Sequence, residues 1–145
     1  MVEIKFVADI RYLGDPILRA IATPVDSFVD AEFANQQQRL YATLLNFRRR
    51  NNFGRAISAP QIGYGKRLIA MHLKGERHII VNPEITWESS GHLTMWDDCM
   101  SFPSLLVRLE RARSSRTNKE GKLIQSSHMV RRSLLSQVIS GFTMM

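Results

Sequence analysis

The stretch VDAEFANQQQRLYATLLNFRRRNNFG, residues 29–54, decides the fold class. Acidic residues lead this stretch and Arg48, Arg49 and Arg50 close it, which is the charge order that a helix dipole favours. Its apolar residues recur at the three- and four-residue intervals of one helix face: Phe33, Leu40, Tyr41, Leu44, Leu45 and Phe47. The stretch therefore predicts a helix with one buried face that ends before Gly54.

On either side of this helix the sequence predicts extended chain. Residues 66–74 (KRLIAMHLK) and 77–88 (RHIIVNPEITWE) are short apolar runs separated by a Gly-Glu turn, and residues 105–113 (LLVRLERAR) begin another extended segment. Pro16 and Pro24 favour a turn and an extended arm before the helix. We expect an α+β fold, with an antiparallel sheet packed on the helix, and a further helix at residues 126–145, whose apolar residues fall near helical spacing.

Length and composition predict one globular domain over residues 1–145, because 145 residues with 44% hydrophobic and 23% charged residues are enough to bury a core. No apolar run reaches the roughly 18 residues of a membrane span. Charged residues interrupt the first apolar stretch, unlike the start of a secretory signal. We expect a cytoplasmic location, or an organellar matrix, and no contact with a membrane.

The net charge of +7 is unevenly distributed along the sequence. Residues 1–103 hold 12 Lys and Arg against 11 Asp and Glu, whereas residues 104–145 hold 8 against 2. The basic third contains one aromatic residue, Phe142, so it lacks the interleaved stacking residues of a single-strand binder. Two interpretations stay open: a solvated basic face, or weak attraction to the ribosome or another RNA.

Cys99 is the only cysteine, so no disulfide can form within the chain. A lone cysteine is either a small buried apolar residue or a reactive or metal-binding thiol, and composition alone favours the buried residue.

Three features follow one another along the sequence. They are the proline-flanked arm and helix, the loop GRAISAPQIG at residues 54–63, and the segment DDCMSFP at residues 97–103, which comes after Asn82-Pro83-Glu84. This order resembles the peptide deformylase family over roughly residues 10–125. That family removes the formyl group from N-formylmethionine at the start of new bacterial or organellar chains. The resemblance implies a peptide deformylase-like α+β fold and a hydrolase that acts in protein biosynthesis on N-formylmethionyl peptides.

Residues 54–61 resemble the family's Gly-x-Gly-aliphatic-Ala-Ala-x-Gln loop, with Ala56 in place of the second Gly and Ser58 in place of the first Ala. Small residues suit a backbone that a peptide must approach in β-like pairing, so Ala56 is expected to cost affinity. The resemblance implies that Gln61 stabilises the oxyanion formed on the formyl group. The implied substrate-binding residues of this loop are Gly54, Arg55, Ala56 and Ile57.

Residues 97–101 resemble the family's Glu-Gly-Cys-Leu-Ser motif. The resemblance implies that Cys99 is a thiolate ligand of a divalent metal, Fe²⁺ or Zn²⁺, and that the Met100 N–H is a second oxyanion donor. Asp98 replaces the family's Gly and adds a negative side chain beside the peptide path. We expect Asp98 to discourage anionic substrates and to raise the pKa of the thiol.

The family's third motif, a helical His-Glu-x-x-His that supplies two metal ligands and a general base, is absent from the 145 residues. The histidines are His72, His78, His92 and His128, and no two are four apart. Residues 134–142 (LLSQVISGF) align with the motif's apolar frame, which puts Gln137 and Gly141 at the histidine positions and Val138 at the base. Metal binding through one thiolate is expected to be weak, and the C-terminal metal-binding helix to be degenerate or truncated.

Three hypotheses follow. The chain is a peptide deformylase whose hydrolytic activity is impaired, a catalytically inactive homologue that still binds peptides, or a decayed product of a gene whose frame is disrupted near codon 125.

Overall fold

The structure is a computed structural model that describes residues 6–112 and 115–117. Its principal helix, α1 (Ala31–Asn51), confirms the helix expected from residues 29–54. The Asp30 carboxylate caps the first turn by accepting a hydrogen bond from the Phe33 N–H at 2.6 Å. The left-handed backbone of Asn52, at φ 59°, ends the helix, and its N–H donates to the Arg48 carbonyl at 2.9 Å.

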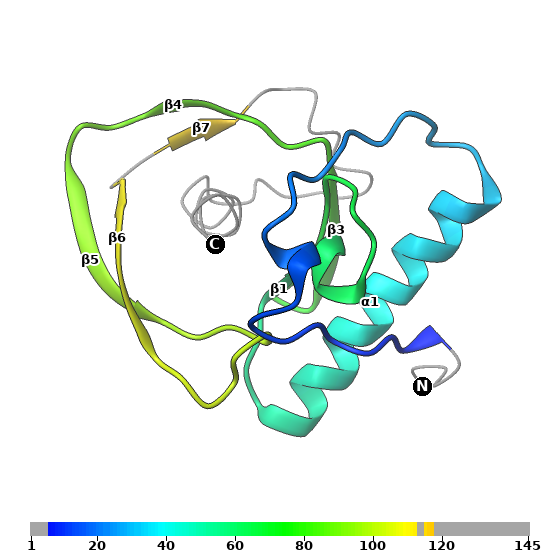
Figure 1. Ribbon diagram of the computed structural model, residues 1–145, viewed down its shortest axis with the longest axis horizontal. Coiled ribbons are helices and arrows are strands. Elements are labelled where there is room, and N and C mark those ends of the chain that lie inside the picture. Colours follow the sequence, from blue (N-terminus) through cyan, green and yellow to red (C-terminus); the bar gives the residue numbers. More distant parts are fainter. Residues whose placement is uncertain (1–5, 113–114, 118–145) are drawn as a thin grey trace.

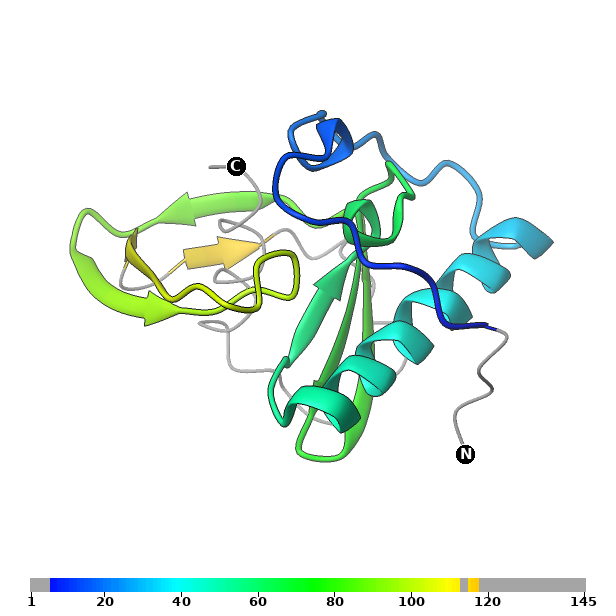
Figure 2. The same ribbon diagram turned by 60° about the horizontal axis from the view of Figure 1, so that its bottom comes forward.

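A three-stranded antiparallel sheet lies against α1 (Figures 1 and 2). Its strands are β1 (Ala56–Ser58), β2 (Leu68–Leu73) and β3 (Glu76–Val81), in the order β1-β2-β3. Lys74 and Gly75 form the β2–β3 turn at φ 50° and 85°. Two successive positive φ values match the tight turns that follow the natural twist of a hairpin, so the turn predicted between residues 74 and 77 is confirmed.

The remaining strands form two separate ribbons beside this sheet (Figure 1). β4 (Ile85–Glu88) pairs with β7 (Ser115–Thr117), and β5 (His92–Asp97) pairs with β6 (Val107–Ala112), both antiparallel. The α+β class and the antiparallel pairing are confirmed, and the strands of the described residues are divided among three sheets. The run at residues 77–88 is divided because Asn82 has a φ of 50° and Pro83 follows, so the chain leaves one sheet before entering the next.

The main core lies between α1 and one face of the three-stranded sheet. Leu40 and Leu44 of α1 are fully buried, as are Ile57 of β1 and Ala70 of β2. Burying each large aliphatic side chain is worth about 1.5–3 kcal/mol relative to exposure. The other face of the sheet also buries apolar side chains, among them Ile69, Met71 and Ile80. This central sheet is therefore the rigid platform on which the neighbouring loops are positioned.

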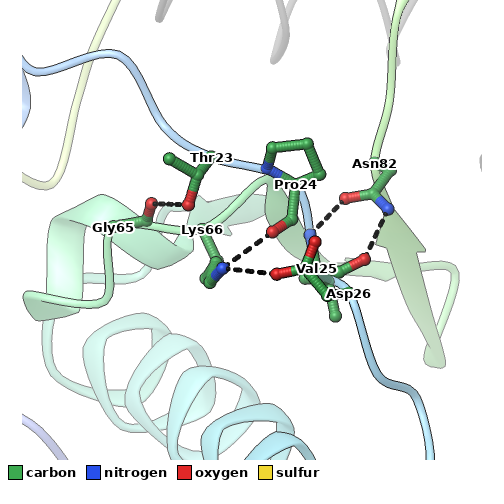
Figure 3. Close-up of polar contacts among 7 residues, drawn as sticks. All are labelled: Thr23, Pro24, Val25, Asp26, Gly65, Lys66 and Asn82. Carbon is green, nitrogen blue, oxygen red and sulfur yellow. Dashed lines mark hydrogen bonds and ion pairs between the residues drawn. The ribbon is translucent and has the colours of Figure 1, made fainter.

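The arm that precedes α1 is fixed to one end of the β2–β3 pair, where β2 begins and β3 ends (Figure 3). It contains a short 3-10 helix, η2 (Pro16–Leu18), which agrees with the expected turn and extended chain. The Asn82 carboxamide accepts from the Val25 N–H at 2.7 Å and donates to the Val25 carbonyl at 2.9 Å. The Lys66 ammonium donates to the Pro24 carbonyl at 2.9 Å and to the Asp26 carboxylate at 3.1 Å. These side-chain contacts hold the arm against the β2–β3 pair, where a regular strand would be held by backbone hydrogen bonds.

Within the described residues, no helix combines the length and the apolar character that crossing a bilayer requires. The helix expected at residues 126–145 lies outside the described residues. The single domain over residues 1–145 therefore stays a prediction.

Candidate functional site

Gln61 lies in a short 3-10 helix, η3 (Ala59–Ile62), which directly follows β1. Its side chain is 2% exposed, and its Oε1 accepts a hydrogen bond from the Ser58 N–H at 3.0 Å. The backbone is held as well, because the Gln61 carbonyl accepts from the Arg11 N–H at 2.7 Å. These contacts fix which end of the carboxamide faces the rest of the site.

The amide end of Gln61 joins the two sequence motifs. Its Nε2 donates to the Ser101 Oγ at 3.0 Å and to the Cys99 Sγ at 3.5 Å. The second contact is long, as expected of a weak sulfur acceptor. Ser101 is itself 2% exposed, and its carbonyl accepts from the Leu13 N–H at 2.9 Å. The loop at residues 54–63 and the segment at residues 97–103 thus form one site.

A second contact joins the motifs through Gly54 and Met100. Met100 is 3% exposed and packs in the main core. A Cβ added at Gly54 would lie 2.7 Å from the Met100 Cε and 3.2 Å from the Phe47 Cδ1, and Gly54 has a φ of +98°. The backbone conformation requires glycine here, and an added Cβ would also displace the flexible end of Met100. The Gly54 carbonyl also accepts from the Arg48 Nη1 at 2.6 Å, which anchors the loop to α1.

β1 is an edge strand among the described residues, since it pairs only with β2. The His72 N–H donates to the Arg55 carbonyl at 2.8 Å, while the Ser58 N–H turns away from β2 to the Gln61 side chain. Hydrogen-bonding direction alternates along an antiparallel strand. The N–H and C=O of Ala56 therefore point to the open edge of β1, where an extended peptide can pair with them.

The other candidate substrate-binding residues differ in what their side chains can reach. Ile57 is 0% exposed in the main core and its backbone faces Ala70 of β2, so it contributes to the site by positioning the edge strand. Arg55 and Asp98 are exposed. The Asp98 N–H donates to the Asp97 Oδ1 at 3.1 Å.

The Cys99 thiol is partly exposed beside Gln61. Burial raises the pKa of this thiol above its ordinary value, the hydrogen-bonding groups of Ser101 lower it, and the negative charges of Asp97 and Asp98 raise it again. The direction expected for Asp98 therefore agrees with its position, although burial is the larger cause. Without a bound cation the thiol is predominantly protonated near neutral pH.

No metal site is formed by the part of the chain that the structure describes, residues 6–112 and 115–117, because no three of its His, Cys, Asp and Glu side chains come together. The His72 Nδ1 lies 2.7 Å from the Tyr41 hydroxyl, and the His78 Nε2 lies 3.9 Å from a Glu76 carboxylate oxygen. His92 is exposed at the far end of β5 from Asp97. His128 lies outside the described residues. A tetrahedral catalytic metal needs three protein ligands, so Cys99 alone does not fit one.

Sequence reasoning gave no role to Ser101, although it matches the final residue of the second motif. Its contact with Gln61 spans 40 positions in the sequence. No local pattern announces a hydrogen bond of that separation, so only the motif match pointed to this residue.

Comparison with known proteins places these features in a family. A family model described as polypeptide deformylase matches residues 7–138. A peptide deformylase of Thermotoga neapolitana is 31% identical over 104 residues, which are 72% of this chain and 60% of that protein. A peptide deformylase of Heliobacterium modesticaldum is 31% identical over 116 residues, or 80% of this chain and 72% of the relative. The chain thus spans about three fifths of the length of the Thermotoga relative.

Solved structures agree with this comparison. A peptide deformylase from Legionella pneumophila superposes with a TM-score of 0.75 at 28% identity, covering 94% of this chain and 78% of that one. The enzyme from Thermotoga maritima superposes with a TM-score of 0.68 at 28% identity, covering 80% and 77%. The fold expected from the two motifs is confirmed.

Proposed function

The chain belongs to the polypeptide deformylase family, and we propose that it binds the N-terminus of N-formylmethionyl peptides without hydrolysing them on its own. One observation carries the proposal: the Gln61 amide is held toward the Cys99 thiol, next to the free edge of β1. A formyl group and the extended backbone that follows it need these two features side by side.

The peptide would pair with the Ala56 N–H and C=O as an added strand on β1. The formyl oxygen would accept hydrogen bonds from the Gln61 Nε2 and the Met100 N–H. Gln61 supports this role because its contact with the Cys99 Sγ, at 3.5 Å, is weak enough to be exchanged for one with oxygen. The Met100 N–H has no acceptor among the residues that the structure describes.

The flanking residues would select among peptides by charge and shape. Gly54 would contribute backbone only, because it has no side chain, and buried Ile57 would hold the edge strand in position. Exposed Asp98 would repel peptides with acidic residues near the N-terminus, and exposed Arg55 would attract them. Ala56, with a methyl group where the family has Gly, would hold the peptide slightly off the strand.

Hydrolysis is the family reaction, and the family depends on a divalent metal, Fe²⁺ or Zn²⁺, that activates water for attack on the formyl carbon. The residues present do not fit such a metal. Cys99 can supply one ligand, and the 145 residues contain no His-Glu-x-x-His pair to supply the other two or the general base. Binding without turnover is therefore the function that the donor set supports. An active enzyme is the alternative, and it requires ligands from outside the described residues, with His128 the first candidate.

Calorimetric titration with formyl-Met-Ala-Ser and with unformylated Met-Ala-Ser tests the proposal. We expect the formylated peptide to bind more tightly, and formate release in the presence of Fe²⁺, Co²⁺ or Zn²⁺ to equal that of a Cys99→Ala variant. Equal affinity for the two peptides would contradict formyl recognition. Turnover that Cys99→Ala abolishes would show that the family reaction runs here.

Reading the gene's other two frames beyond codon 125 separates true divergence from an interrupted gene. A His-Glu-x-x-His in either frame, in phase with the upstream motifs, would identify a disrupted deformylase and would remove the argument for selected peptide binding.

We also propose weak attraction of the basic residues 104–145 to the ribosome or another RNA, supported by 8 Lys and Arg against 2 Asp and Glu. This partner and a formylated substrate would place the chain in the cytoplasm or an organellar matrix. A peptide with the sequence of residues 104–145 should bind labelled RNA at low salt and release it as salt rises. Binding that does not change with salt would contradict an electrostatic origin.

A further inference from the structure

Six cationic side chains from three elements gather at one end of the molecule, although residues 1–103 are close to neutral as a sequence. This basic end comprises residues at the end of α1, the start of β1 and the β2–β3 turn. Figure 2 shows these three segments together at the bottom of the view. The residues of the basic end are Arg48, Arg49, Arg50, Arg55, Lys74 and Arg77.

Contacts between the elements hold the basic end together. The Tyr41 hydroxyl of α1 lies 2.7 Å from the His72 Nδ1 of β2, and the Arg77 guanidinium lies 4.9 Å from the centre of the Tyr41 ring. The Arg55 carbonyl accepts from the His72 N–H at 2.8 Å. These contacts hold the end of α1, the start of β1 and the β2–β3 hairpin next to one another.

Among the described residues, the cations of the basic end are not paired with carboxylates. Glu76 is the one carboxylate within the segments that form it, and none of the six cations makes an ion pair with a carboxylate of the described residues. The acidic residues Asp30 and Glu32 lie at the opposite end of α1, about 30 Å away along a helix of this length. The net charge of residues 1–103 is therefore close to zero although positive and negative side chains lie at opposite ends of α1.

Helix stability does not explain the whole arrangement. Arginines in the last turn of α1 interact favourably with the helix dipole, which accounts for Arg48, Arg49 and Arg50. It does not account for Arg55, Lys74 and Arg77, which come from strands and a turn. Placing further like charges beside that turn costs free energy unless an anion is bound there.

We propose that the basic end binds the phosphate backbone of a nucleic acid. Five of its six cations are arginines, whose planar guanidinium donates paired hydrogen bonds that match phosphate oxygens. The aromatic rings at this end are already engaged within the described residues, since Arg77 covers one face of the Tyr41 ring and Phe53 packs edge-on against Phe47 with ring centres 5.0 Å apart. The surface therefore favours backbone contact without base selection. The basic end is a different surface from the basic C-terminal third, and the proposed binding of nucleic acid does not depend on the proposed binding of peptides.

Fluorescence anisotropy of a labelled single-stranded RNA, titrated with the full chain, tests this surface. Arg50→Glu combined with Lys74→Glu reverses two exposed charges of the basic end. Arg19→Glu combined with Arg108→Glu is the matched control, because it changes the net charge equally at exposed positions elsewhere. We expect the first variant to lose at least tenfold more affinity than the control. The slope of log affinity against log salt should also flatten by about 1.4, since each phosphate contact on a single strand contributes about 0.7.

Three outcomes would overturn the proposal. The first is an equal loss of RNA affinity in the two variants, which would reflect net charge or the C-terminal third, and the second is unchanged RNA affinity in the basic-end variant. The third is binding to phosphatidylserine vesicles, but not to RNA, that depends on the basic end. Arg50→Lys combined with Lys74→Arg should retain full affinity. Circular dichroism and the melting temperature of every variant should match the parent chain, because the substituted side chains are exposed.

Discussion

The Gln61 Nε2 donates a hydrogen bond to the Ser101 Oγ at 3.0 Å, and both side chains are 2% exposed. Replacing Ser101 by Ala would leave a buried amide hydrogen without its acceptor, which costs about 1–3 kcal/mol. We expect Ser101→Ala to lower the free energy of unfolding by that amount, measured by urea denaturation. It should also weaken formyl-peptide binding more than binding of the unformylated peptide, because the amide is no longer held in place.

Ser101→Thr is the control, since it keeps the hydroxyl and should retain the preference for the formylated peptide. If Ser101→Ala weakens both peptides equally, Ser101 supports the fold without positioning Gln61.

The space at Gly54 leads to a second prediction. Gly54→Ala places a methyl group 2.7 Å from the Met100 Cε at a residue with φ +98°. The backbone is the main cause of the cost, because an L-residue with positive φ loses about 1–2 kcal/mol, whereas the end of the Met100 side chain is flexible and can move aside. We expect a lower melting temperature and weaker peptide binding, because the methyl group displaces Met100. Gly91→Ala is the control, since nothing lies within 4 Å of its added Cβ. Equal melting temperatures for the two variants would mean that Gly54 and Met100 are not packed as described.

Local patterns predicted the parts of the fold that depend on neighbouring residues. The spacing of Leu40, Leu44 and Phe47 predicted α1, and the alternation of short apolar runs predicted β2, β3 and β6. The division at Asn82 was not predictable from propensity, because its left-handed backbone is stabilised by bonds to Val25, 57 positions away.

The site was predictable in membership and unpredictable in geometry. The motifs identified Gln61 and Cys99, but the contact that joins them and the part played by Ser101 exist only once the arm, η3 and the segment after β5 have packed together. The clustering of cations at the basic end was hidden for the same reason, because a count along the chain cannot register that Arg77 of β3 packs on Tyr41 of α1.

The Tyr41–His72 pair predicts a pH dependence of stability. Burial lowers the pKa of His72 below its ordinary value, and the positive charges of Arg48 and His78 lower it further. The folded state therefore binds a proton less readily than the unfolded state. Stability should fall as pH drops through about 6.5, where the unfolded His72 protonates, and the loss should stop below the lower folded pKa.

His72→Asn retains an acceptor for the Tyr41 hydroxyl but does not titrate. Urea midpoints measured from about pH 7.5 to about pH 5 should fall less for this variant than for the parent chain. Parallel curves for the two proteins would show that other histidines cause the pH dependence.

Metal affinity gives the last prediction, because the donor set is visible in both sequence and structure. Cys99 is one thiol ligand, and a closed zinc site uses four ligands. We expect Zn²⁺ and Co²⁺ to bind substoichiometrically and to be removed by dialysis against a chelator, as measured by elemental analysis.

Gln137→His combined with Gly141→His would place two imidazoles four residues apart, which share one face if residues 134–142 are helical as the sequence predicts. That variant should bind Co²⁺ with a thiolate-to-metal absorption band that disappears in a Cys99→Ala background. It should still release no formate without Val138→Glu, because the general base would be missing. Unchanged metal affinity in the two-histidine variant would refute the alignment of residues 134–142. One tightly held equivalent of metal in the parent chain would show that ligands beyond Cys99 exist, and His128→Ala would be the next substitution to measure.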